Sequence, residues 1–235
     1  MTTVAIYSLK GGVGKTTLAI NLAWCAATMS ARRTLLWDLD PQASATWLLG
    51  DGAAHDRAGA LFARGVAPDK LIRATPFDRL DLLPADASLR DLNHLLRALD
   101  KKRRLRKLIA ELGDHDTVIL DCPPGLTETA EQVVRAADLL VVPVVPSAFS
   151  QQAFAMLDRA FGGQVPMLPV HMMVDRRRAL HIEAVERHPD WPVIPMASAV
   201  ENATAQRLPT GVAQPRSPAA AAFAQLWRTI EQLRT

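Results

Sequence analysis

The chain has 235 residues, of which 49% are hydrophobic, and carries a formal net charge of +3. This length and hydrophobic fraction fit a single α/β domain over residues 1–235 with a buried core, and the slight positive charge is compatible with an anionic partner without identifying one. No apolar run is long enough to span a membrane and strand-forming residues begin at position 3, so we expect neither a transmembrane segment nor a cleaved signal, and the two cysteines favour reduced thiols in the cytoplasm.

The first predicted elements are a strand over residues 2–8, a glycine-rich loop and a helix that ends near Ser30. This order is the setting of a phosphate-binding loop, because glycines let backbone N–H groups approach phosphate oxygens and the helix N-terminus attracts anions. Lys15 is expected to reach the β- and γ-phosphates, the Thr16 hydroxyl to bind Mg²⁺, and Thr17 to lie near the α-phosphate. A glycine turn without a ligand is the alternative, and the agreement of glycine spacing, lysine, hydroxyl and flanking elements disfavours it.

The loop departs from the ordinary pattern at its start. Leu9 stands where the standard phosphate-binding loop has its first glycine, and an additional lysine, Lys10, precedes the glycines. A lysine at this position is close enough to the phosphates to favour a functional role over a solvated surface charge.

The second predicted strand covers residues 33–37 and ends in the sequence Asp38-Leu39-Asp40-Pro41-Gln42. Carboxylates at the carboxyl end of a parallel strand lie where α/β sheets bind ligands, so Asp38 and Asp40 could serve a metal and a water molecule. Asp-Pro is also a common turn sequence, and it is the phosphate loop upstream that favours the functional interpretation.

A third strand, residues 117–121, ends in Asp121 and is followed by Cys122-Pro123-Pro124-Gly125. An aspartate at the tip of a buried strand downstream of a phosphate-binding loop is the Walker B arrangement, in which the carboxylate holds the coordination sphere of Mg²⁺.

The remaining pattern predicts the fold class. Further strands are expected at 79–83, 138–143, 168–174 and 192–196, with helices between most of them. Such alternation is typical of a doubly wound, mostly parallel sheet flanked by helices. Surface loops are expected at 51–60 and at 209–218.

The last predicted helix, residues 218–233, has apolar side chains at helical spacing: Phe223, Leu226, Trp227, Ile230 and Leu233. We expect this face to pack against the sheet. A membrane-surface helix is the alternative, but it would need more basic residues than Arg228 and Arg234.

Two basic clusters could contact DNA phosphates. Residues 101–107 hold six positive charges, and Arg176, Arg177 and Arg178 precede another predicted helix. A solvated helix face is the alternative for each cluster. No helix-turn-helix segment is apparent, which disfavours sequence-specific binding.

The segment Lys10-Gly11-Gly12-Val13-Gly14-Lys15-Thr16-Thr17 resembles the deviant Walker A loop of the ParA/MinD family of ATPases, and Asp38 to Gln42 and Asp121 to Pro124 resemble two further family motifs in the right order. The resemblance covers nearly the whole chain, is closest to the small, Soj-like ParA proteins, and implies a P-loop NTPase fold with ATP and Mg²⁺ as cofactors. It implies catalytic roles for three residues: Lys10, which would contact the partner's nucleotide in an ATP-sandwiched homodimer, Lys15, and Asp40, which would orient the attacking water. It implies Mg²⁺ contacts for Thr16, Asp121 and, through the metal's water shell, Asp38. The implied nucleotide-binding residues are Lys10, Gly11, Gly12, Val13, Gly14, Lys15, Thr16, Thr17, Gln42 near the γ-phosphate, and Pro195 and Met196 near the adenine.

The chain departs from the family pattern at two places. Ala43-Ser44 stands where the family usually has Gly-Asn, and Met196 stands where many relatives have an arginine after Ile-Pro. The loss of that arginine leaves the DNA surface to other residues, for which the candidates are Arg176, Arg177, Arg178, Arg187 and Arg216.

The function that the resemblance implies is an ATP-dependent dimerising switch that binds DNA nonspecifically and positions a plasmid, a chromosome region or a protein complex. A ParB-like protein or another cargo adaptor would accelerate its slow hydrolysis, and it would be cytoplasmic and nucleoid-associated, with no membrane contact. Two alternatives stay open: a MinD-like membrane-associated switch, and a metabolic enzyme on the same nucleotide-binding fold, such as a relative of amide ligases or dethiobiotin synthetase.

Overall fold

The computed structural model describes residues 1–50, 58–63, 65–98 and 103–233. Its centre is a sheet with the strand order β3-β4-β2-β5-β1-β6-β7-β8, in which β3 is antiparallel to β4 and every other neighbouring pair is parallel. The strands are β1 (Thr2–Ile6), β2 (Thr34–Asp38), β3 (Arg73–Ala74), β4 (Leu80–Leu83), β5 (Thr117–Asp121), β6 (Leu139–Val144), β7 (Met167–Val174) and β8 (Val193–Pro195).

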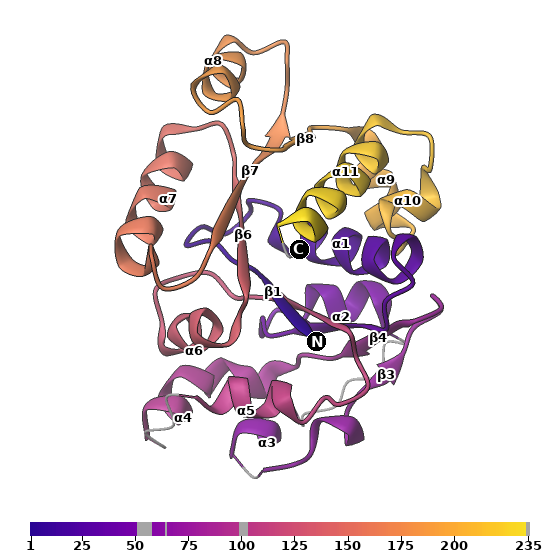
Figure 1. Cartoon of the computed structure of the whole chain (residues 1–235), viewed down its shortest axis with the longest axis vertical. Coiled ribbons are helices and arrows are strands. Elements are labelled where there is room, and N and C mark those ends of the chain that lie inside the picture. Colours follow the sequence, from indigo (N-terminus) through magenta and orange to yellow (C-terminus); the bar gives the residue numbers. More distant parts are fainter. Residues whose placement is uncertain (51–57, 64, 99–102, 234–235) are drawn as a thin grey trace.

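Helices cover both faces of the sheet (Figure 1). They are α1 (Lys15–Met29), α2 (Ser44–Leu49), α3 (Ala58–Ala63), α4 (Leu92–Ala98), α5 (Arg104–Ala110), α6 (Glu128–Ala136), α7 (Ala148–Phe161), α8 (Ala179–Arg187), α9 (Ser198–Ala205), α10 (Thr210–Ala213) and α11 (Pro218–Gln232), with short 3₁₀ turns at Pro68–Lys70 and Ala87–Asp91. The predicted doubly wound, mostly parallel sheet is confirmed.

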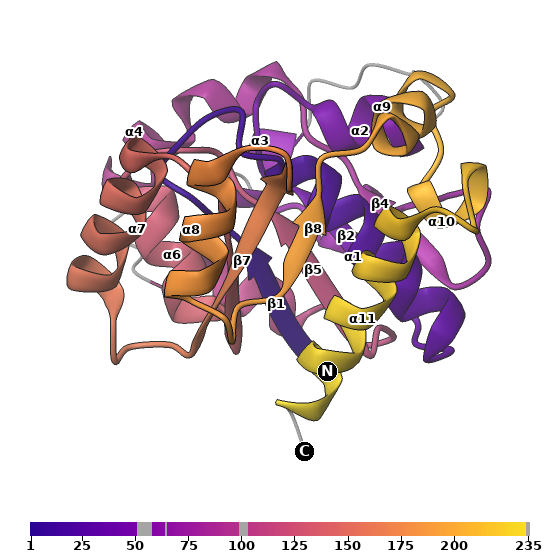
Figure 2. The same ribbon diagram turned by 90° about the horizontal axis from the view of Figure 1, so that it is seen from above.

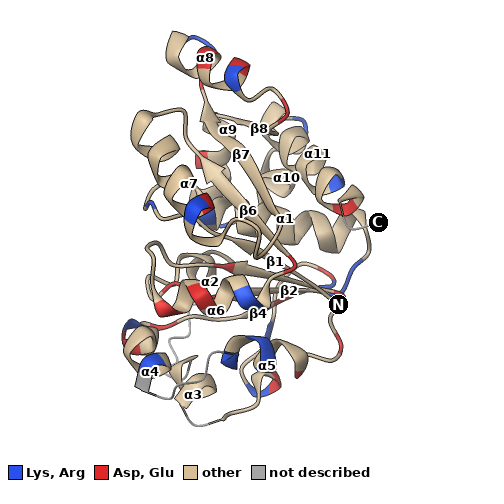
Figure 3. Cartoon of the chain, turned by 60° about the vertical axis from the view of Figure 1, so that its left-hand side comes forward, with Lys and Arg blue, Asp and Glu red and all other residues tan. Residues whose placement is uncertain are grey.

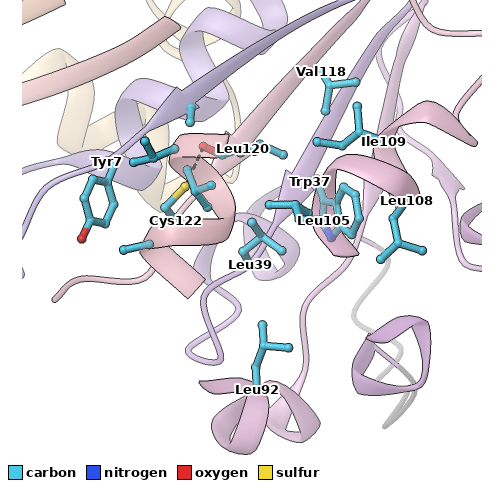
Figure 4. Close-up of a cluster of buried hydrophobic side chains, with 14 of the residues drawn as sticks. Tyr7, Trp37, Leu39, Leu92, Leu105, Leu108, Ile109, Val118, Leu120 and Cys122 are labelled. Atoms are coloured by element: carbon cyan, nitrogen blue, oxygen red, sulfur yellow. Dashed lines mark hydrogen bonds between the residues drawn. The ribbon is translucent and has the colours of Figure 1, made fainter. Parts of the chain in front are cut away.

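Alternation along the buried strands gives each face of the sheet its own core. On β5, Val118 and Leu120 belong to one cluster of buried side chains, whereas Ile119 between them belongs to the other. The first cluster includes Trp37 and the buried faces of α3 to α7, and Figure 4 shows part of it. The second is closed by α1, α2 and α11. Successive residues of a strand point to opposite faces, which explains why these strands read as continuous apolar runs.

The last helix packs inside the second core. Phe223, Leu226, Trp227 and Ile230 are at most 1% exposed, and α11 lies alongside α1 (Figure 2). The prediction of a packed helix is confirmed for these four residues, whereas Leu233 lies beyond the helix and is 61% exposed. No helix in the described ranges is long and apolar enough to cross a membrane.

Three local predictions need correction. The segment 209–218 contains the short helix α10, and Thr210 is buried because its N–H donates to Asn21 Oδ1 at 2.8 Å. Residues 58–60 of the predicted loop 51–60 begin α3, while 51–57 lie outside the described residues. The two-residue edge strand β3 was missed, because so short a segment carries no readable alternation.

Candidate nucleotide-binding site

The glycine-rich loop joins β1 to α1 at the carboxyl end of the central strands. Gly12 and Gly14 have positive φ angles of 71° and 87°, a region that favours glycine. A Cβ atom on Gly14 would also lie 2.9 Å from Met172 Cε. The left-handed backbone at the turn into α1 therefore favours glycine at position 14, and the Met172 methyl of β7 packs closely against it.

Lys15, the first residue of α1, points back over the loop. Its side chain is largely buried, and its Nζ donates a hydrogen bond to the carbonyl oxygen of Lys10 at 3.0 Å. Burial lowers the pKa of the Lys15 ammonium, and the negative charges of Asp121 and Asp40 oppose this shift. The loop thus holds a cation inside its curve, where a phosphate would neutralise it.

Asp38 and Asp121 face each other across neighbouring strands, since they are register partners on β2 and β5 and both are fully buried. Asp38 is satisfied: its Oδ1 accepts from the Asp40 N–H at 3.1 Å, and its Oδ2 accepts from the N–H and hydroxyl of Thr46 at 2.9 and 2.8 Å. Burial raises its pKa to about 6, and the hydrogen bonds from Thr46 oppose that rise. Asp38 therefore holds the start of α2, in addition to any role toward the metal's water shell.

Asp121 is in the opposite situation. Neither of its carboxylate oxygens has a hydrogen-bond partner of normal geometry among the described residues. Burial and the neighbouring Asp38 raise the pKa of Asp121, while the hydroxyl of Thr16 and the ammonium of Lys15 oppose the rise. A buried carboxylate without partners is costly, and a bound cation would relieve the cost.

The residues present fit Mg²⁺. Thr16 is only partly buried and, with Asp121, supplies oxygen donors beside the cavity. No group of three or more His, Cys, Asp or Glu side chains in the described part of the chain could hold a metal by itself. Mg²⁺ does not need such a cage, because it usually keeps several waters and binds one or two protein oxygens together with phosphate.

The loop after β2 is shaped by its own carboxylate. Asp40 Oδ1 accepts from the Gln42 N–H at 2.9 Å, and Ala43 follows with a positive φ of 54°. Ala43 is the position where the family usually has glycine, and the left-handed backbone here gives the physical reason for that preference. The Asp40 side chain stays close enough to Lys15 to affect its pKa.

A cavity of about 830 Å³ opens beside the loop. Of the residues predicted to bind nucleotide or metal, eight line it: Gly11, Gly12, Gly14, Lys15, Thr16, Thr17, Asp40 and Gln42. Six other lining residues lie outside every motif that the sequence analysis singled out: Ile20, Trp47, Leu48, Asn93, Met173 and Thr204. These come from α1, α2, α4, β7 and α9, and only their place in the fold brings them to the same hollow.

Four predicted nucleotide residues, Lys10, Val13, Pro195 and Met196, do not line this cavity, and neither do the predicted metal residues Asp38 and Asp121. Val13 is buried beneath the loop. Pro195 ends β8, and Met196 is 59% exposed with its N–H bonded to the carbonyl oxygen of Val174 at 2.9 Å. This hydrogen bond places Met196 beside β7, whose Met173 does line the cavity. Contacts between adenine and residues 195–196 stay a prediction.

Lys10 points away from its own cavity. Its Nζ lies 4.9 Å from the centre of the Phe149 ring, a cation–π distance, and Phe149 at the start of α7 is 71% exposed. The side chain is therefore near the surface, as a residue that reaches a second subunit must be.

Basic and acidic residues lie close together along α8 (Figure 3), and two of the candidate DNA residues are paired with acids. Arg177 makes two hydrogen bonds of 2.9 Å to Asp175, and Arg187 bonds Glu183 at 2.7 Å. Arg176, Arg178 and Arg216 are exposed. In the cluster 101–107, Lys101 and Lys102 lie outside the described residues, and the rest does not form one solvated face, because Arg104 is half-buried and donates to the Leu61 carbonyl.

Comparison with known proteins agrees with this geometry. The family model described as "AAA domain" matches residues 1–161. The chromosome partitioning protein ParA of Caulobacter vibrioides is 33% identical over 192 residues, which cover 75% of this chain and 71% of the relative. The chain belongs to the ParA family of partitioning ATPases. The sporulation initiation inhibitor protein Soj of Bacillus subtilis is 28% identical over 97% of both chains.

Solved structures show the same fold. The cell division ATPase MinD of Pyrococcus furiosus is 27% identical with a TM-score of 0.79 and covers 99% of both chains. Cobyrinic acid a,c-diamide synthase from Mycobacterium smegmatis, solved with an ATP analog and magnesium, is 24% identical with a TM-score of 0.80 over 99% of this chain and 94% of that one. At 24% identity, the similarity to the synthase supports a shared fold and no shared activity.

Proposed function

We propose that this ParA-family protein is an ATP-dependent dimerising switch that binds DNA nonspecifically and positions a cargo. The observation that carries the proposal is the buried carboxylate of Asp121, which accepts no hydrogen bond of normal geometry from the described residues and lies near Thr16 and Lys15, two residues that line a cavity whose glycine-rich loop fits phosphates. These groups together suit Mg-ATP, which would neutralise Lys15 with phosphate and Asp121 with the metal.

Each residue then has a definite task. Backbone N–H groups of Gly11 to Thr16 and the Lys15 ammonium would bind the β- and γ-phosphates. Mg²⁺ would be held by Thr16 and, directly or through water, by Asp121, and would neutralise charge on the phosphates. Asp40 lines the cavity near Lys15, where its free oxygen could orient the attacking water.

The dimer is supported by Lys10. Its side chain leaves its own cavity and lies beside an exposed Phe149, so in a face-to-face pair it could reach the partner's phosphates. Charge supplied across an interface makes hydrolysis depend on assembly, which is what a switch requires. The slow rate and its acceleration by a ParB-like or other cargo adaptor belong to this proposal.

DNA binding would use the exposed arginines near the dimer face and at Arg216. Nonspecific phosphate contacts need only exposed cations, and affinity should fall steeply with salt. We infer a nucleoid-associated location from this binding.

Sedimentation of the Asp40→Ala variant tests the switch. With Mg-ATP it should sediment as a dimer and shift random-sequence DNA in a gel, whereas with Mg-ADP or without nucleotide it should be a monomer that leaves DNA unshifted. Asp69→Ala, on an exposed 3₁₀ turn, is the control and should turn over ATP like the wild type.

Three outcomes would count against the proposal. A monomer under all three conditions would contradict the dimerising switch. An ATP dimer that binds anionic vesicles and ignores DNA would favour the MinD-like alternative, and turnover that needs a small-molecule acceptor would favour a metabolic enzyme.

A further inference from the structure

We propose that Trp47 packs against the nucleoside part of the bound nucleotide and that Arg207 positions its indole ring for this contact. The inference rests on the proposed ATP site and adds a residue that its motifs do not contain. Trp47 lies about one turn into α2, five residues after Gln42, and lines the same cavity as the phosphate-binding loop.

The exposure of Trp47 is the first observation. Trp47 is 54% exposed, whereas Trp37 and Trp227 are at most 1% exposed. A large aromatic side chain facing a cavity leaves much apolar surface in water unless a ligand covers it. Nothing in the core requires Trp47, since the inward-facing residues of α2 are Ala45, Leu48 and Leu49.

The cavity also has two chemically different ends. The loop, Lys15 and Asp40 provide N–H groups and charges that suit phosphates and Mg²⁺, while Ile20, Trp47 and Met173 provide apolar surface. Thr17, expected near the α-phosphate, is between them on α1. A nucleotide has the same polarity, because a charged triphosphate is followed by a base with an apolar face that stacks on aromatic rings.

Arg207 supports the ring from outside the cavity. Its guanidinium carbon lies 5.2 Å from the Trp47 ring centre, and its Nη2 donates to the carbonyl oxygen of Gly50, which ends α2, at 2.7 Å. Arg207 has a positive φ of 56° because it lies just past the end of α9, where the Leu208 N–H donates to the Ala203 carbonyl oxygen at 3.0 Å. Its Nε is buried without a hydrogen-bond partner in the described part of the chain. The bond to Gly50 and the end of α9 together hold the guanidinium beside the Trp47 ring.

The test compares ADP with inorganic tripolyphosphate, each with Mg²⁺, in isothermal titration calorimetry on the full chain. Trp47→Ala should weaken ADP binding about 5- to 100-fold, the range of one base–aromatic stack, and leave tripolyphosphate affinity unchanged. Trp47→Phe should restore most of the ADP affinity. Arg207→Ala should weaken ADP binding by about 2- to 5-fold in the wild type and not at all in the Trp47→Ala background, because its effect passes through the ring.

Tryptophan fluorescence gives a second readout. ADP should change the emission of the wild type and of the control Trp191→Phe, which alters a tryptophan on the α8 side, but should leave the emission of Trp47→Phe unchanged. Equal ADP affinity in Trp47→Ala and wild type would overturn the inference, and so would an equal loss of ADP and tripolyphosphate in that variant. Failure of the wild type to bind either ligand would instead contradict the proposed nucleotide site itself.

Discussion

The phosphate end of the sheet and the α8 segment use charge in opposite ways. At the phosphate end, Lys15, Asp38 and Asp121 are buried, and the register between β2 and β5 fixes the two aspartates opposite each other. On α8 and the turn before it, Arg177 and Arg187 are exposed and paired with neighbouring acids. Buried charges are expensive and persist where a ligand or a hydrogen bond compensates them, whereas exposed pairs contribute little and constrain little. The environment of Asp121 therefore indicates a bound cation, whereas the environment of Arg177 does not indicate a ligand.

The largest expected effect comes from removing the buried ammonium. Lys15→Ala should lower kcat for ATP hydrolysis at least about 100-fold, since a preorganised cation at the phosphates would be lost. Steady-state phosphate release measures it, with the exposed Lys70→Ala as the control. Turnover within a few fold of the wild type would remove Lys15 from the site.

The two facing aspartates should respond in opposite directions. Asp121→Asn removes a buried charge that accepts no hydrogen bond of normal geometry from the described residues, and the desolvation relieved should exceed the lost attraction to Lys15, so the ligand-free protein should be stabilised by about 1 kcal/mol. Asp38→Asn keeps one acceptor oxygen and replaces the other by an NH₂ donor, which leaves the N–H of either Asp40 or Thr46 without its acceptor and should destabilise the protein by about 1–3 kcal/mol. Urea unfolding without nucleotide measures both changes.

The same pair also tests the metal assignment. Mg-ADP should raise the thermal unfolding temperature of the wild type and much less that of Asp121→Asn, because part of the metal's compensation is lost. If both substitutions destabilised the ligand-free protein, this would contradict the assignment of Asp121 as a buried carboxylate that a bound cation compensates.

The contribution of an arginine to DNA binding should depend on whether an acidic neighbour already pairs with it. Arg176→Ala should weaken nonspecific DNA binding of the ATP form a few fold and reduce its salt dependence, because an exposed cation is lost. Arg177→Ala should have less effect, since Asp175 already neutralises that guanidinium. Filter binding across a salt series measures both, and equal effects would show that Asp175 releases Arg177 to DNA.

The smallest expected effect is on the free energy of unfolding and comes from the hydrogen bond that joins α8 to the turn before it. His181 Nδ1 accepts from the Asp175 N–H at 3.0 Å, and burial lowers the pKa of His181, as does the charge of Arg178. As pH falls, the unfolded chain therefore binds a proton on His181 before the folded protein does. The contribution of neutral His181 to the free energy of unfolding is complete above about pH 6.5, the pKa of a free histidine. Below that pH the contribution decreases, by at most about 1.4 kcal/mol per pH unit. His181→Gln should flatten the change in unfolding free energy between pH 7.5 and 5.5. An unchanged slope would show that His181 does not titrate in this way.

The sequence predicted best where backbone geometry follows from residue type. Glycines at 12 and 14, the lysine after them and the strand-tip carboxylates can be placed because loop, helix start and strand ends have fixed shapes. The sequence did not predict that Asp38 is satisfied and Asp121 is not, since this depends on Thr46 of a separate helix. Trp47 and Thr204 were missed for the same reason, because the cavity they line forms only when α2 and α9 pack beside α1.

Mixing two inactive variants tests the central claim most directly. Lys10→Ala removes the lysine proposed to act in trans, and Asp40→Ala removes the residue proposed to orient the attacking water. A mixed dimer would contain one complete site, built from Asp40 of the first variant and Lys10 of the second. The account predicts that each variant alone is nearly inactive with Mg-ATP, and that an equimolar mixture recovers up to about a quarter of wild-type turnover, since half the dimers are mixed and each has one complete site of two. A mixture as inactive as its parts would contradict the assignment of Lys10 to the partner's nucleotide and the ATP-bridged dimer with it.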